Sequence, residues 1–223
     1  MTSIPAPRLA AFALALTATL AHAQDCTEDA MIVFDGSGSM AEVGFNLFAE
    51  PRIFEARRAM GRVMSEIAAV RRLGLVVYGP GGADACSGID LRFGPVADAA
   101  PRIVGAVEAL QPEGETALTE AVRRAAEVLG GRGTVVLVTD GKETCGGQPC
   151  ALAAALPGAT VVHVIGFKVR GDFFAWQAAG EAVEIETVAR CLADGTGGRY
   201  VSTETVDELA DALRDTLGCA LMF

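Results

Sequence analysis

The sequence predicts an α/β fold: a doubly wound, mostly parallel sheet of six strands, with one antiparallel edge strand and helices on both faces. Segments with strand-like apolar runs alternate along the chain with segments that have helical apolar spacing. Residues 135–138 and 161–165 are apolar runs typical of central parallel strands covered by helices on both faces. Residues 89–93 alternate apolar and polar side chains, which favours an antiparallel edge strand.

In the first half of the chain, strands are predicted at residues 31–34 and 73–78, before the alternating strand at residues 89–93. Helices are predicted where apolar side chains recur every three or four positions and so share one face. The first such series is Ile53, Ala56, Met60, Val63, Ile67 and Val70. Two shorter series follow, one with Ile103, Val107 and Leu110 and one with Leu118, Val122, Ala125 and Leu129.

In the second half, the central strands at residues 135–138 and 161–165 are followed by a short strand at residues 200–202. A helix is predicted at residues 181–192, ended by the glycines at positions 195, 197 and 198. A closing helix carries the stripe Val206, Leu209, Leu213 and Leu217. Residues 168–180 show no clear pattern.

The first 23 residues have the pattern of a secretory signal peptide. A single basic residue, Arg8, precedes an apolar stretch at residues 9–20, and Ala21-His22-Ala23 has the small-x-small form of a cleavage site. The apolar stretch is shorter than the roughly 20 residues of a membrane-spanning helix. We therefore expect a signal peptide at residues 1–23 and a single domain at residues 24–223, without a transmembrane segment after cleavage.

The chain is acidic, with a formal net charge of −10. Loss of residues 1–23 would remove one arginine and no acidic residue, so the exported chain would be one unit more negative. An acidic surface repels phosphate backbones, which makes nucleic-acid binding unlikely as a function class. The Ala-x-Ala site and the acidic, alanine-rich composition indicate a bacterial exported protein, either periplasmic or secreted.

A candidate metal site begins where the first strand ends. Asp35, Ser37 and Ser39 follow the strand at alternate positions, separated by Gly36 and Gly38. Carboxylate and hydroxyl oxygens are hard ligands, which suit Mg²⁺, Mn²⁺ or Ca²⁺ rather than Zn²⁺. The two glycines are expected to fold the loop tightly through positive φ angles.

Two other turns offer the remaining oxygens. Thr116 directly precedes a predicted helix, and Asp140 directly follows the strand at residues 135–138 and Thr139. Such turns cluster at the carboxyl ends of the strands in an open parallel sheet, where ligands bind. The individual residues could equally be ordinary helix caps and turn residues. Their joint occurrence at three junctions favours the metal site.

The three motifs, Asp-x-Ser-x-Ser, Gly-x-Thr-x-Leu and Thr-Asp-Gly, resemble the von Willebrand factor type A (VWA) domain family over residues 29–219. The resemblance implies a Rossmann-like fold and a metal-ion-dependent adhesion site (MIDAS). At that site Asp35, Ser37, Ser39, Thr116 and Asp140 would hold one divalent cation, most simply Mg²⁺. One position would stay open for an Asp or Glu carboxylate of a protein or peptide partner. Many family members have proline where this chain has Ala117, a difference that removes no ligand.

Six cysteines follow the signal segment, which is typical of an oxidising compartment. In the predicted fold, Cys26 before the first strand and Cys219 after the last helix lie on the face opposite the metal, and we expect them to pair. A local bridge between Cys145 and Cys150 would leave Cys86 and Cys191 to pair across the domain, which the short reach of a disulfide disfavours. We therefore favour a scheme in which Cys86 and Cys191 each bond to either Cys145 or Cys150. Which of them bonds to which stays open.

Enzymatic functions find little support in the sequence. His163 is the one histidine left after signal cleavage and is expected to lie in the core, so a Ser-His-Asp mechanism has no base. A metal-assisted hydrolase using Asp35 is an alternative, but Ser37 stands where such enzymes commonly have a second acid. We expect a binding module; a domain that is only stabilised by its metal is the other alternative.

Several side chains near the predicted site allow two interpretations. Lys142 and Glu143 are either loop charges or contacts for a partner. Phe45, Leu47 and Phe48 either pack into the core or form an apolar rim beside the metal.

Overall fold

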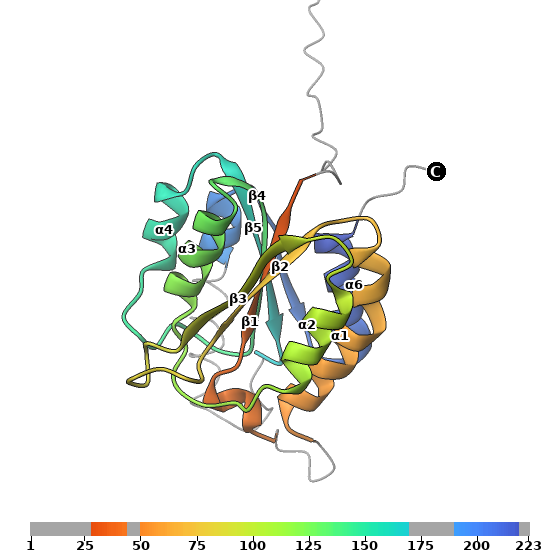
Figure 1. Cartoon of the computed structure of the whole chain (residues 1–223). Coiled ribbons are helices and arrows are strands. Elements are labelled where there is room, and N and C mark those ends of the chain that lie inside the picture. Colours follow the sequence, from red (N-terminus) through yellow and green to blue (C-terminus); the bar gives the residue numbers. More distant parts are fainter. Residues whose placement is uncertain (1–27, 44–49, 170–189, 219–223) are drawn as a thin grey trace, which may run out of the picture.

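The computed structural model describes residues 28–43, 50–169 and 190–218. Its centre is one six-stranded sheet with the strand order β3-β2-β1-β4-β5-β6 (Figure 1). β3 is antiparallel to β2, and the other neighbouring strands are parallel. The predicted sheet, with its antiparallel edge strand, is confirmed.

The strands lie close to their predicted positions. They are β1 (Ala30–Asp35), β2 (Leu73–Tyr78), β3 (Ile89–Val96), β4 (Arg132–Thr139), β5 (Ala159–Phe167) and β6 (Tyr200–Thr203). The residues of β1 and β2 are buried throughout, as expected for strands covered on both faces. β3 is only partly buried, in keeping with its place at the sheet edge.

Helices cover both faces of the sheet, and Figure 1 shows the two layers on either side of it. α1 (Arg52–Ala68), α2 (Ala100–Glu108) and α6 (Val206–Leu217) pack on one face, around Ile32 and Phe34. α3 (Leu118–Val128) and α4 (Pro149–Ala155) pack on the other face, around Met31 and Val33. Alternate residues of β1 therefore enter opposite cores, as the alternation of side chains along a strand requires.

The register brings the ends of the central strands to one edge. Asp35, the last residue of β1, is paired with Tyr78 at the end of β2. Phe34 is paired with Val138, so Thr139, the last residue of β4, lies level with Asp35, and Asp140 follows in the loop. Parallel strands that end together place the loops that follow them side by side.

Two short elements were absent from the prediction. α4 has the sequence PCALAAA, in which Leu152 is the only large buried side chain, so no apolar stripe marks it. The 3-10 turn η1 (Gly38–Ala41) buries Met40. The prediction for Val70 is wrong: α1 ends at Ala68, and Val70 is 54% exposed in the turn that follows. Of the helix predicted at residues 181–192, only residues from 190 onward are described, and residues 190–195 are helical.

Two disulfides join Cys86 to Cys145 and Cys150 to Cys191. The favoured scheme, in which Cys86 and Cys191 each bond to one of the 145/150 pair, is confirmed. Cys150 lies within α4. The predicted bridge between Cys26 and Cys219 lies outside the described residues, as do the signal segment at residues 1–23 and the apolar rim residues of the 44–49 segment.

Within the three described ranges, no helix has both the length and the apolar character needed to cross a membrane.

Candidate metal centre

Asp35 is the buried anchor of the candidate site. It ends β1 with no exposed surface. Its Oδ1 accepts hydrogen bonds from the backbone N–H of Ser37 at 2.8 Å and from Ser37 Oγ at 2.6 Å. Its Oδ2 accepts from Thr139 Oγ1 at 2.8 Å. A carboxylate held by this many donors has a fixed orientation.

The glycines of this loop act differently from the prediction. Neither Gly36 nor Gly38 has a positive φ. A Cβ on Gly36 would lie 2.8 Å from Leu110 Cδ2 and 3.0 Å from Tyr78 O, so a side chain there would crowd Leu110 and the end of β2. The positive φ occurs instead at Gly79, in the loop that packs against this one.

The two serines link Asp35 to Asp140. Ser37 Oγ and Ser39 Oγ are 3.1 Å apart, and Ser39 Oγ donates to Asp140 Oδ1 at 2.6 Å. The turn η1 begins at Gly38 and brings the Ser39 side chain back over the end of β1. Four of the five predicted site residues therefore form one continuous series of polar contacts.

Thr116 lies next to this series, two residues before α3. Its loop is fastened by Thr144: the Thr116 N–H donates to Thr144 Oγ1 at 2.9 Å, and the Thr144 N–H donates to Thr116 O at 3.1 Å. A Cβ built on Gly141 would lie 3.7 Å from Thr116 Oγ1 and 3.9 Å from Ser39 Oγ. Both hydroxyls thus border the small space beside Gly141. The structure brings all five predicted residues to one place.

Burial, followed by the neighbouring negative charge of Asp35, raises the pKa of Asp140 to about 7, although Ser39 and Arg52 act in the opposite direction. A bound cation would offset the repulsion between these two buried carboxylates. Among the described residues, no group of three or more His, Cys, Asp or Glu side chains could hold a metal. The donors here are instead hydroxyls and two carboxylates, which fit a hard divalent cation such as Mg²⁺.

Arg52, which the sequence analysis missed, also reaches the site. It begins α1, and its Nη1 donates to Ser39 O at 3.0 Å and to Asp140 Oδ2 at 3.3 Å. Nothing in the local sequence marks it, because it is one of many arginines and its partner Asp140 is 88 positions away. Only the packing of α1 against the strand ends reveals its role.

Two further residues, Tyr78 and Thr139, hold Asp35 in place through hydrogen bonds. The buried Tyr78 OH donates to Thr139 Oγ1 at 2.9 Å, and Thr139 in turn donates to Asp35. Burial and the nearby Asp35 raise the pKa of Tyr78 well above its usual value, so it remains a neutral donor. Both residues end strands, which is the one signal that could have identified them.

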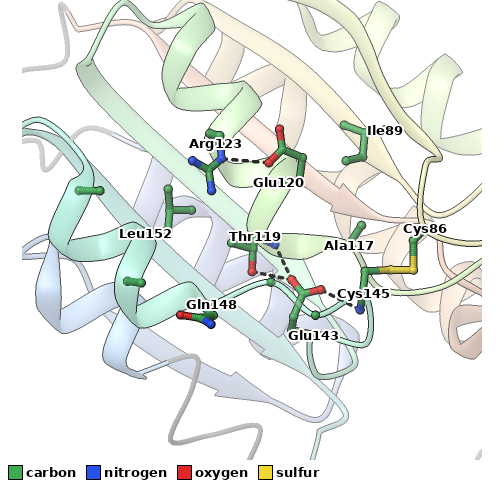
Figure 2. Close-up of a pocket in the computed structure, with 14 residues that line it drawn as sticks. Cys86, Ile89, Ala117, Thr119, Glu120, Arg123, Glu143, Cys145, Gln148 and Leu152 are labelled. Carbon is green, nitrogen blue, oxygen red and sulfur yellow. Dashed lines mark hydrogen bonds and ion pairs between the residues drawn. A yellow bond between two sulfur atoms is a disulfide. The ribbon is translucent and has the colours of Figure 1, made fainter.

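Glu143 belongs to the structure of the loop. Its Oε2 accepts from the Thr119 N–H at 2.8 Å and from Thr119 Oγ1 at 2.5 Å, and its Oε1 accepts from the Cys145 N–H at 2.9 Å (Figure 2). These bonds tie the loop after β4 to the first turn of α3. Of the two interpretations of Glu143, a loop charge therefore fits the structure better than a contact for a partner. The carboxylate is held by hydrogen bonds within the loop and to α3.

A cavity of about 610 Å³ lies beside this loop, and Figure 2 shows residues that line it. It lies between α3 and α4 and is bordered by the Cys86–Cys145 disulfide, Glu143 and Leu152. None of the five predicted site residues is among the described residues that line it, so the cavity and the candidate metal centre are neighbours and not one site.

His163 lies in the core, as predicted. It is 2% exposed, and its Nδ1 accepts a hydrogen bond from the Arg199 N–H at 3.0 Å. Burial, followed by the positive charges of Arg199 and Arg71, lowers its pKa to about 4. At neutral pH it is an uncharged part of the sheet.

Comparisons with known proteins agree with this fold. The model of the von Willebrand factor type A domain matches residues 30–143, just over half of the chain. An uncharacterized protein of Bacillus subtilis (strain 168), YwmD, is 29% identical over 198 residues, which is 81% of each chain.

Solved structures share the fold at low sequence identity. BatB from Bacteroides thetaiotaomicron has a TM-score of 0.60 at 18% identity, covering 85% of this chain and 96% of that one. The pilus adhesin SpaC from Lactobacillus rhamnosus GG has a TM-score of 0.63 at 14% identity, covering 86% of this chain and 30% of that one. With the domain model matched over β1 to the loop that carries Asp140, and with the strand order and loop geometry described above, this chain belongs to the von Willebrand factor type A domain family.

Proposed function

We propose that this protein is a metal-ion-dependent binding module, an adhesion or scaffold domain that recruits a partner protein or peptide through an acidic side chain. The observation that carries the proposal is the meeting of five oxygen-bearing side chains from three separate loops: Asp35, Ser37, Ser39, Thr116 and Asp140. These residues would hold one divalent cation, most simply Mg²⁺, with Mn²⁺ and Ca²⁺ as alternatives.

The protein residues have separate tasks in this proposal. When bound, the cation would supply a Lewis-acidic position that a partner carboxylate can occupy. Asp35 is oriented by Ser37 and Thr139, and it would contribute a negatively charged oxygen to the cation. Ser37, Ser39 and Thr116 contribute neutral oxygens, which leave more of the positive charge uncompensated than carboxylates would. Asp140 completes the set from the loop after β4.

A binding function also agrees with the family. VWA domains form a fold family of protein interaction and adhesion, and the SpaC protein with a similar fold is a pilus adhesin. The proposal gives the chain no catalytic role. The buried His163 is held within the sheet and is remote in sequence from every residue of the candidate site.

The test is a pull-down from an extract of the cells that make the protein, with the purified domain as bait. We expect a partner to be retained with MgCl₂ and lost with a chelator. Asp140→Ala should lose it even with MgCl₂. Asp90→Ala, which removes an exposed carboxylate from β3, is the matched control and should retain it. Identical captures under all four conditions would contradict the proposal. Metal-dependent melting without a metal-dependent partner would instead indicate a purely structural ion.

We also propose that residues 1–23 are an export signal and that residues 24–223 form a single exported domain, in the periplasm or outside the cell. The two disulfides among the described residues support this, since such bonds persist in oxidising compartments. A mature N-terminus other than Gln24, measured by mass spectrometry on protein from the producing cells, would contradict it.

A further inference from the structure

Arg52 brings a positive charge to the edge of the candidate metal centre. Its Nη1 contacts three oxygens: Ser39 O at 3.0 Å, Asp140 Oδ2 at 3.3 Å and Glu42 Oε2 at 3.4 Å. Asp140 therefore has one oxygen directed to Ser39 and the other to Arg52. The guanidinium lies beside the group of proposed ligands without being one of them.

This charge is poorly screened. The Arg52 side chain is 17% exposed, and the Asp140 side chain is fully buried. Arg52 Nε is buried and has no hydrogen-bond partner among the described residues. Charges shielded from water interact more strongly and over longer distances than surface charges do. Glu42, in contrast, is 68% exposed, so solvent screens its contribution.

The charges of the centre that are shielded from solvent can be added, leaving aside the exposed Glu42. Asp35 and Asp140 contribute two negative charges when ionised, and Arg52 contributes one positive charge. With a divalent cation the sum is one positive charge, whereas without Arg52 it would be zero. A positive sum attracts a carboxylate, and the same guanidinium repels the cation at short range.

We propose that Arg52 sets the charge of the site: it lowers the affinity for the divalent cation and keeps the loaded site net positive for a carboxylate partner. This inference rests on the proposed function of the metal centre. A different role is conceivable for Arg52, in which it only holds Asp140 in place as a ligand. The two roles predict opposite changes in metal affinity when Arg52 is replaced.

The test measures Mn²⁺ affinity by isothermal titration calorimetry at pH 8 and low salt. Arg52→Gln should bind Mn²⁺ about tenfold more tightly than the wild type, because the repulsion is gone. The second readout is acetate, the simplest carboxylate, followed through the proton relaxation that bound Mn²⁺ causes. Arg52→Gln should bind acetate several-fold more weakly once loaded with Mn²⁺.

Two further variants separate charge from geometry. Arg52→Lys keeps the charge but loses the planar fork, and should match the wild type within about threefold for both ligands. Arg62→Gln removes the same charge about 15 Å along α1, where Arg62 pairs with Asp207 at the surface, and should change neither affinity.

The outcomes are distinct. Weaker Mn²⁺ binding by Arg52→Gln, or a loss beyond about threefold in Arg52→Lys, would overturn the inference in favour of a positioning role. Should Arg52→Gln fail to fold in circular dichroism spectra, Arg52→Lys alone decides between the two roles. If the wild type itself binds no Mn²⁺, the proposed function fails. This result differs from one in which the wild type binds Mn²⁺ but the affinity of the variants changes in the direction opposite to that expected.

Discussion

At the scale of single residues, the orientation of Asp35 depends on a relay of hydroxyl groups. Tyr78 OH donates to Thr139 Oγ1, and Thr139 donates to Asp35 Oδ2. All three residues are buried, so water cannot replace a lost partner. Removing the middle member leaves both Tyr78 OH and Asp35 Oδ2 short of a hydrogen bond, and a buried group without its partner carries the full cost of desolvation.

Thr139→Val should therefore lower the free energy of unfolding by about 1–3 kcal/mol and weaken Mn²⁺ binding, because Asp35 loses one of the donors that aim it. Urea unfolding and calorimetric titration measure the two effects. Thr160→Val is the matched control: its hydroxyl is equally buried but has no hydrogen-bond partner among the described residues. The control should leave stability unchanged or higher. Equal losses in both variants would show that the relay has no special role.

At the scale of elements, the two disulfides differ in their relation to the site: one fastens a loop that carries a site residue, and the other does not. Cys86–Cys145 joins the loop after β2 to the loop after β4, which carries Asp140. Thr144, next to Cys145, also fastens Thr116 through two hydrogen bonds. Cys150–Cys191 instead ties α4 to the helical residues 190–195, away from the site.

Replacing Cys86 and Cys145 together by serine should lower the free energy of unfolding by about 2–4 kcal/mol, since the bond closes a long loop. It should also weaken Mn²⁺ binding, because the loop that carries Asp140 and Thr144 loses an anchor. Replacing Cys150 and Cys191 by serine should cost a similar stability and leave Mn²⁺ affinity near the wild-type value. Equal affinities in the two double variants would contradict this coupling of the first disulfide to the site.

The sequence is sufficient to predict most elements, but not α4 and η1. β1, β4 and β5 are long apolar runs, and apolar side chains recur along one whole face of α1. These patterns are clear enough to identify the elements from the sequence. α4 is held by one leucine, one alanine and a disulfide, and no periodicity arises from so few contacts. Val70 continues the spacing of α1 although the chain has already turned, because spacing alone does not show where a helix ends.

The residues of the candidate site also fall into those that the sequence predicts and those that only the structure reveals. The five oxygen-bearing residues stand in recognisable motifs, and the parallel sheet brings their loops together. Arg52, Tyr78 and Thr139 carry no such motif, since their roles arise from the packing of α1 and from the register of β2 and β4. The role of Gly36 was predicted as backbone freedom, but the structure gives it a steric reason that only the neighbouring Leu110 reveals.

At the scale of the whole molecule, stability as a function of pH contains two opposing contributions. The pKa of Asp140 is raised to about 7, so without a bound cation the folded state gains stability as the pH falls from about 7 toward 4. The pKa of His163 is lowered to about 4 from 6.5, so the unfolded chain takes up a proton first. The contribution of the neutral His163 to the free energy of unfolding is fully present above pH 6.5 and is lost as the pH falls toward 4.

His163→Gln isolates the second contribution, because an amide oxygen can still accept from the Arg199 N–H but does not titrate. In a chelating buffer, we expect the unfolding free energy of the wild type to fall relative to the variant by roughly 3 kcal/mol between pH 7 and pH 4. Asp140 titrates equally in both proteins, so its opposite effect cancels in the difference. His163 is the one histidine in residues 24–223, and no other imidazole contributes. Parallel stability curves, measured by urea unfolding at each pH, would mean that His163 is not kept neutral by its surroundings.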